Sequence, residues 1–252
     1  MKENHMQTTN KTFQNLVTAD IVENEPVRQK VRIHKFTGKE KHFISLVEAS
    51  LLTRRHRDKA GRGAIKGGFF GRKIYEKILA QEGCVGVRNY FAALNDGTPT
   101  VVLVGVNEGG DDMIRGVLGD DAFPCPPFQG CYNLLNSGLE DYLVPLMKKE
   151  NVFTGKENHC ITLAEARHFV DNFRKVNDAD VVKGGYFSRE IYEKILSQED
   201  CVGIRNYFAE TTDCTPTLVV VGVDSRGHDQ IHGVVGDDMI LCPPHSSSEV
   251  AL

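Results

Sequence analysis

The chain carries an internal duplication, and this feature limits how it can fold. A segment that begins at Phe36 returns at Phe153, 117 positions later (153 − 36 = 117), and the match runs without a gap to the Cys-Pro-Pro sequences at Cys125 and Cys242. Roughly half of the aligned residues are identical, far more than a shared fold alone requires. Because each copy has the length of a small domain, the duplication predicts two modules of one fold that work as a pair.

The alignment divides the chain into an arm, two modules, a linker and a tail. The arm covers residues 1–35, the first repeat module 36–127, the linker with a short helix 128–152, the second repeat module 153–244, and the C-terminal tail 245–252. Hydrophobic residues make up 40% of the 252 residues and charged residues 25%, so the composition is that of an ordinary globular protein.

Each module begins with a helix signal. Ser45 and Glu48 have the spacing of a capping box, and so do Thr162 and Glu165 in the second copy. Apolar residues at helical spacing predict a second helix over about 71–82, with its equivalent in the second copy. The Lys-Gly-Gly sequence between the two helices is typical of a turn, or of a backbone nest for an anion.

Three strands follow the second helix. They are predicted over 84–91, 100–106 and 114–118, and the short connections between them indicate antiparallel neighbours. The predicted fold class is α+β, with two tandem α-α-β-β-β modules whose small antiparallel sheets are related by a pseudo-twofold axis. In the alternative arrangement, the two sheets join edges into one six-stranded sheet.

Cys84 and Cys201 are candidate nucleophiles because they occupy the same place in both copies. Arg88 and Arg205 follow four residues later and would lower the thiol pKa from the same strand face. The alternative is a small buried residue between helix and sheet. The chain has seven cysteines but no Cys-x-x-Cys pair, so the spacing of a structural zinc site is absent from the sequence.

Both copies also contain a Gly-Asp-Asp sequence after an apolar strand. Paired aspartates at a strand end can bind Mg²⁺, and one further aspartate in each copy adds a third oxygen ligand. The candidate metal ligands are Asp112, Asp120, Asp121, Asp229, Asp237 and Asp238. The alternative is an acidic turn in which the carboxylates accept hydrogen bonds from backbone amides. We expect no cofactor.

One basic run lies near the end of the first helix. Its members, candidates for anion or nucleic-acid binding, are Arg54, Arg55, Arg57, Arg62 and Lys66. The second copy lacks most of these charges, and the net charge of −4 gives no general attraction to nucleic acid. A solvated helix end, where cations are favourable, is the alternative.

Several residues have the character of interface residues. Arginine and tyrosine on one sheet face are favoured at protein contacts, and apolar clusters occur in the arm and in the linker. The candidate interface residues are Arg88, Tyr90, Arg205, Tyr207, Phe13, Leu16, Leu143 and Leu146.

The module resembles an uncharacterised family of small bacterial proteins. The resemblance rests on Gly-Cys-Val-Gly-Val-Arg-Asn-Tyr-Phe at 83–91, Val-Gly-Val at 104–106 and Cys-Pro-Pro at 125–127, and on the same pattern in the second copy. This sequence departs from the family pattern at Phe91 and Phe208, where tyrosine is usual, and at Asp200, where glycine is usual. The resemblance implies a soluble bacterial protein and no particular activity.

The sequence therefore favours a non-enzymatic protein that associates with itself into a homo-oligomer or filament. The chain contains no apolar stretch of membrane-spanning length and no apolar leader, so we expect a cytoplasmic protein whose partner is a further copy. Two alternatives remain open: a small hydrolase or transferase that depends on a metal or a cysteine, and an anion- or nucleic-acid-binding module at the basic run.

Overall fold

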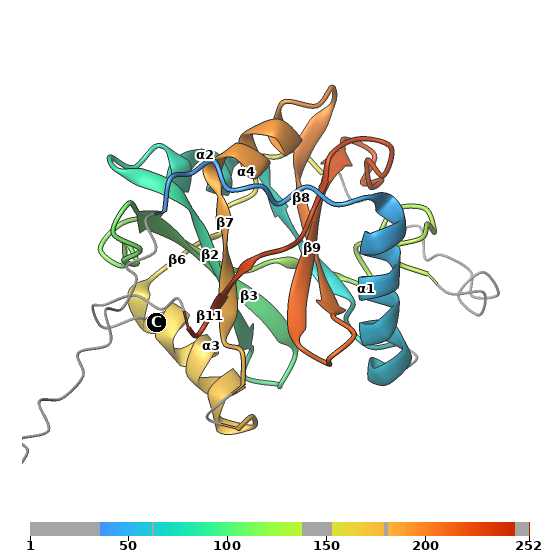
Figure 1. Cartoon of the computed structure of the whole chain (residues 1–252), viewed down its shortest axis with the longest axis horizontal. Helices are drawn as coiled ribbons and strands as arrows, with labels where there is room; N and C mark the ends of the chain where they lie inside the picture. The colour runs from blue at the N-terminus through green and yellow to red at the C-terminus, as the bar shows by residue number, and fades with distance from the viewer. Residues whose placement is uncertain (1–35, 62, 138–152, 179–180, 245–251) are drawn as a thin grey trace, which may run out of the picture. The chain divides into compact units, whose positions relative to one another are not determined.

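The computed structural model describes residues 36–61, 63–137, 153–178, 181–244 and Leu252. The predicted arm with Phe13 and Leu16, and the linker residues Leu143 and Leu146, lie outside the described residues, as does Arg62. The described fold thus consists of the two repeats and the segment directly after the first of them (Figure 1).

The two repeats have the same order of elements, except that strand β6 of the second has no counterpart strand in the first. The first contains α1 (Leu46–Ala60), β1 (Gly67–Gly71), α2 (Arg72–Leu79), β2 (Cys84–Ala93), β3 (Pro99–Asn107), β4 (Leu118–Gly119) and β5 (Phe123–Cys125). The second contains β6 (Cys160–Ile161), α3 (Leu163–Lys175), β7 (Gly184–Ser188), α4 (Arg189–Leu196), β8 (Cys201–Glu210), β9 (Pro216–Asp224), β10 (Val235–Gly236) and β11 (Ile240–Cys242). The shared strand–helix–strand–strand order confirms an α+β fold and is consistent with the internal duplication.

The predicted capping boxes are present. The Ser45 hydroxyl accepts a hydrogen bond from the Glu48 backbone N–H at 3.2 Å, and the Glu48 carboxylate accepts one from the Ser45 N–H at 2.9 Å. Thr162 and Glu165 make the same reciprocal pair at the start of α3. Each pair satisfies two backbone donors that the first helical turn leaves without partners.

The turn predicted at Lys-Gly-Gly is wrong, because the two glycines begin strand β1 in the first repeat and β7 in the second. A Cβ atom on Gly67 would lie 2.1 Å from the Asn206 carbonyl oxygen, and one on Gly184 would lie 2.0 Å from the Asn89 carbonyl oxygen. The neighbouring strand approaches so closely that only glycine fits. Glycine here serves strand pairing rather than chain reversal.

The repeats exchange strands between two antiparallel sheets. The five-stranded sheet has the order β10-β9-β8-β1-β5, and the six-stranded sheet has the order β11-β7-β2-β3-β4-β6. Strand β1 of the first repeat pairs with β8 of the second, and β7 of the second pairs with β2 of the first. Both sheets therefore combine the two repeats, which the prediction of one small sheet per module did not include.

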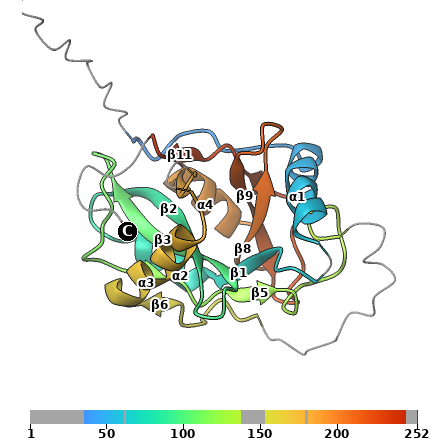
Figure 2. The ribbon, with the colours of Figure 1, turned by 90° about the horizontal axis from the view of Figure 1, so that it is seen from below.

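The outer helices are exchanged in the same way. Helix α1 of the first repeat covers β8 and β9, where Ala49 packs with Tyr207 and Val219. Helix α3 of the second repeat covers β2 and β3, where Ala166 packs with Tyr90. Figure 2 shows α1 and α3 at opposite sides of the two sheets.

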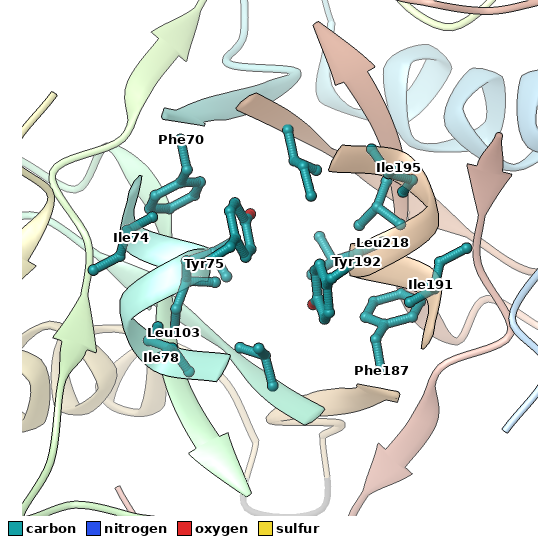
Figure 3. Close-up of a cluster of buried hydrophobic side chains, with 14 of the residues drawn as sticks. Phe70, Ile74, Tyr75, Ile78, Leu103, Phe187, Ile191, Tyr192, Ile195 and Leu218 are labelled. Atoms are coloured by element: carbon teal, nitrogen blue, oxygen red, sulfur yellow. The ribbon is translucent and has the colours of Figure 1, made fainter. Parts of the chain in front are cut away.

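The inner faces of the sheets share one core with α2 and α4. This core contains side chains of both repeats, including Phe70, Ile74, Phe187 and Ile191. At its centre the rings of Tyr75 and Tyr192 stack with centroids 5.0 Å apart and an interplanar angle of 27°. Figure 3 shows the two rings facing each other from α2 and α4, with the apolar side chains of each helix arranged around them.

Candidate functional site

Buried networks hold the arginine and tyrosine that the sequence assigned to an interface. Arg88 forms an ion pair with Asp112 and donates to the Gly110 carbonyl oxygen at 3.0 Å, while the Tyr90 hydroxyl donates to Asp112 at 2.6 Å. Arg88 and Tyr90 are both 0% exposed. These side chains therefore contact other parts of this chain rather than a second molecule.

The second repeat builds the same network. Arg205 pairs with Asp229, and the Tyr207 hydroxyl donates to Asp229 at 2.6 Å. Arg205 and Tyr207 are also 0% exposed. Since Asp229, like Asp112, accepts from arginine and tyrosine, both predicted metal ligands are used in internal hydrogen bonds.

The two aspartates of each Gly-Asp-Asp sequence have different surroundings. Asp120 and Asp237 are buried and accept hydrogen bonds from the hydroxyl groups of Thr100 and Thr217. Burial raises the pKa of Asp120 to about 7 and that of Asp237 to about 6. Burial thus disfavours the carboxylate form of both groups, which is the form that a Mg²⁺ ligand needs.

The second aspartates form exposed turns with left-handed backbone conformations, with φ of 60° at Asp121 and 59° at Asp238. Their carbonyl oxygens lie 2.8 Å from Nδ1 of His159 and His42, respectively. Each of these contacts joins one repeat to the other. Among the described residues, no group of three or more His, Cys, Asp or Glu side chains is arranged to hold a metal ion.

Cys84 and Cys201 lie in the shared core rather than beside the arginines that follow them. A bulge between Cys84 and Gly86 shifts the strand register by one residue, so Cys84 packs with Val87 while Arg88 belongs to the opposite face. The predicted sharing of one strand face is therefore wrong. Burial raises the pKa of both thiols, although nearby Arg189 and Arg72 lower it in part. Both thiols are therefore favoured in the protonated form, which is a poor nucleophile.

The basic run makes internal contacts. Arg54 pairs with Asp58 at 3.5 Å, Arg57 donates to the Leu135 carbonyl oxygen, and Lys66 donates to the Asn136 carbonyl oxygen at 2.7 Å. Arg57 and Lys66 therefore attach the segment that follows the first Cys-Pro-Pro to the fold. In the second repeat Arg174 donates in the same way to the carbonyl oxygen of Leu252, the equivalent of Leu135.

A groove with a volume of about 600 Å³ runs between α1 and the β8–β9 hairpin. The α1 side includes Phe43, Leu51 and Arg55, and the opposite side includes Thr217 and Asp237. Phe43 lies just before α1, and Val47 and Leu51 lie one turn apart on the helix; we call these three exposed apolar residues the α1 strip. Their exposed fractions are 39%, 65% and 47%.

The equivalent positions of the second repeat carry no large apolar side chain. Cys160, Ala164 and His168 occupy the positions of Phe43, Val47 and Leu51. Nε2 of His168 lies 2.5 Å from Oδ1 of Asn95 in the β2–β3 turn, so α3 is linked there to the hairpin that it covers. The α1 strip is thus a difference between the repeats rather than a product of their common fold.

A second asymmetric cluster brings together a thiol, an imidazole and a carboxylate. The Cys131 Sγ lies 3.3 Å from Nε2 of His228, and Nδ1 of His228 lies 3.8 Å from Oδ2 of Asp224. Cys131 is exposed and Asp224 is buried. Sequence reasoning missed this cluster because Cys131 and His228 are 97 positions apart, and neither residue is repeated at the equivalent position of the other copy.

Comparisons with family models, with curated proteins and with solved structures return no match. The resemblance to a bacterial family therefore stays a prediction, whereas the repeated order of elements stands on the structure itself. Among the described residues, no helix has the length and apolar composition needed to cross a membrane.

Proposed function

We propose that this protein is a non-enzymatic self-association protein whose repeats form a pseudo-twofold unit and whose α1 strip binds a second copy. The observation that carries this proposal is the exposed apolar row on α1, which its counterpart on α3 lacks. Three of the five exposed large hydrophobic side chains in the described part of the chain belong to this row. Exposed apolar side chains gathered in one place mark interaction sites more often than isolated ones do.

The pseudo-twofold relation is supported by the exchange of equivalent elements. Residues at positions n and n + 117 make the same contacts, as in the pairing of Gly67 with Tyr207 and of Gly184 with Tyr90. A homodimer of a single module could form the same contacts between two chains. We propose that the duplication fused such a dimer into one chain.

The sheet edges support self-association less well than α1 does. The outermost strands β10, β5, β11 and β6 are two or three residues long, and β5 and β11 end at Cys-Pro-Pro. Short edges interrupted by proline are poor templates for an added strand. We therefore place the contact on the α1 strip rather than on the strand edges.

The charges beside the strip suit two antiparallel α1 helices related by a twofold axis. Glu48 lies in the first turn of α1, and Arg55 lies two turns later on the side that faces the groove. Antiparallel packing places Glu48 of one copy near Arg55 of the other, and the twofold axis repeats the pair. Such pairs contribute more to the choice of orientation than to affinity.

Sedimentation equilibrium over a range of concentrations tests the proposal. We expect a reversible dimer for the intact protein and a monomer for Leu51→His, which places on α1 the residue found at the same position of α3. Arg55→Glu should also weaken the dimer, because it opposes two acidic side chains. Val176→Ser, a change at an exposed apolar residue away from the strip, is the matched control. An intact protein that remains monomeric at high concentration contradicts the proposal.

A further inference from the structure

We propose that Cys131 is a reactive thiol that forms mixed disulfides with small soluble disulfides, with His228 as its base. The cluster combines three elements of nucleophilic activation: an exposed sulfur, an imidazole nitrogen 3.3 Å from it, and a buried carboxylate on the far side of the ring. In such an arrangement the base takes the thiol proton, and the nearby carboxylate stabilises the charge that the base acquires. This inference is independent of self-association through α1.

The turn after β9 holds the base in place. Asp224 Oδ1 accepts hydrogen bonds from the backbone N–H groups of Arg226 and His228, each at 2.9 Å. Its other oxygen accepts from the Arg226 guanidinium at 2.9 Å and faces Nδ1 of His228. The carboxylate is thus fixed by the same turn that carries the imidazole.

The thiol is held against this turn by the segment that follows the first Cys-Pro-Pro. A Cβ atom on Gly130 would lie 2.4 Å from the Gly227 carbonyl oxygen, so the residue before Cys131 approaches the turn closely. Asn133 and Asn136 donate to the Cys131 carbonyl oxygen at 3.3 and 3.2 Å and also to Asp229, which is paired with Arg205. The position of the sulfur therefore follows from contacts between the two repeats.

The charged and titratable groups around the sulfur come from both of these segments. Asp224, Arg226 and His228 belong to the turn, and Asp229 lies behind Asn133. Arg226 is exposed, and its guanidinium is paired with Asp224.

The surroundings favour disulfide exchange over acyl transfer. Acyl transfer needs hydrogen-bond donors for an oxyanion, and the side-chain amides of Asn133 and Asn136 are already bonded to Cys131 and Asp229. Exchange needs only a thiolate and access for the disulfide, and Cys131 is exposed. In the step, the thiol proton passes to His228 Nε2, Sγ bonds to one sulfur of the disulfide, the disulfide bond breaks, and the departing sulfur takes the proton.

The other repeat lacks all three groups. Ser248, Asp111 and Asn107 stand at the positions equivalent to Cys131, His228 and Asp224. The exposed cysteines Cys160 and Cys214 provide internal controls. Cys160 has the Lys77 ammonium 3.2 Å from its sulfur, whereas Cys131 has an imidazole, so the comparison separates the effect of a nearby cation from that of a base.

The test is modification of the full-length protein by oxidised glutathione, followed at each cysteine by peptide mass spectrometry from pH 6 to 9. At pH 7 we expect Cys131 to react about tenfold faster than Cys160 and Cys214, because a positioned base accelerates proton transfer. In His228→Gln this advantage should disappear at pH 7, and it should shrink toward pH 9, where ordinary thiols ionise without a base.

Two further measurements keep the result interpretable. The thermal unfolding midpoint of His228→Gln shows whether the turn still folds, and iodoacetamide labelling tests the thiol with a smaller probe that cannot be excluded by size. Equal rates at all three exposed cysteines with both probes overturn the proposal, and so does an unchanged Cys131 rate in a folded His228→Gln protein.

Discussion

The stacked pair of Tyr75 and Tyr192 provides a direct test of whether the two repeats form one cooperative unit. The rings belong to different repeats, are 0% exposed, and stack at a centroid distance of 5.0 Å. Asn206 Nδ2 donates to the Tyr75 hydroxyl at 3.2 Å, and Asn89 Nδ2 donates to the Tyr192 hydroxyl at 2.9 Å. Each tyrosine therefore joins the two repeats by packing and by a hydrogen bond.

The expected energies follow from these contacts. Tyr75→Leu keeps an apolar side chain but removes the ring stacking, a contribution of about 0.5–1.5 kcal/mol. It also leaves the buried Asn206 amide without the hydroxyl, at a cost of about 1–3 kcal/mol. Tyr75→Leu and the equivalent variant Tyr192→Leu should therefore each lose about 2–4 kcal/mol of unfolding free energy. The double variant should lose less than the sum by about 0.5–1.5 kcal/mol, because the stacking can be lost only once.

Guanidinium chloride unfolding followed by circular dichroism measures all four corners of this double-mutant cycle. A single transition is expected for each protein, with the midpoint lowered and the slope retained in the variants. A coupling energy of zero, or two separate transitions of which a single variant shifts only one, refutes the shared core.

Three further substitutions test the buried contacts by the same unfolding assay. Gly67→Ala should cost about 3 kcal/mol, because the added Cβ meets the Asn206 carbonyl oxygen and forces the strands apart; a stabilised variant contradicts this pairing. Asp112→Asn should cost about 3–5 kcal/mol, because it removes the carboxylate charge that is paired with the buried Arg88 cation, and an unchanged stability argues against the ion pair. Asp120→Asn should gain stability relative to the intact protein as the pH rises from 4 to 8. The pKa of Asp120 is about 7 in the folded protein and about 3.8 in the unfolded chain, so ionisation of this group favours unfolding. The unfolding free energy of the intact protein should therefore fall by up to roughly 4 kcal/mol over this interval. A stability difference between the variant and the intact protein that does not change with pH contradicts the raised pKa.

The local parts of the fold follow from the sequence because their causes are local. The capping box at Ser45 fixes the start of a helix through neighbours in the chain, and the apolar strands around a short turn pair with each other. Strand β1 was missed because glycine has little strand propensity by itself. Its reason, the close approach of Asn206, comes from the other repeat.

The exchange between repeats could not be predicted for a related reason. Two modules with the same pattern of elements offer each strand two equivalent partners, and the residue pattern is satisfied by either one. The burial of Arg88 could not be predicted either, because arginine is usually exposed. Its partner Asp112, which compensates for the burial, comes into contact with it only in the folded chain. The contact between Cys131 and His228 could not be predicted either, because it joins the segment after the first repeat to a turn of the second repeat.

Cleavage of the linker tests the exchange of strands most directly. A protease site placed within residues 138–152 allows the folded protein to be cut between the two repeats, and size-exclusion chromatography without denaturant then reports whether the fragments separate. Because β1 pairs with β8 and β7 pairs with β2, we expect the two fragments to elute together at the volume of the intact chain and to separate only in denaturant. Fragments that elute separately as folded proteins under native conditions would contradict the exchange.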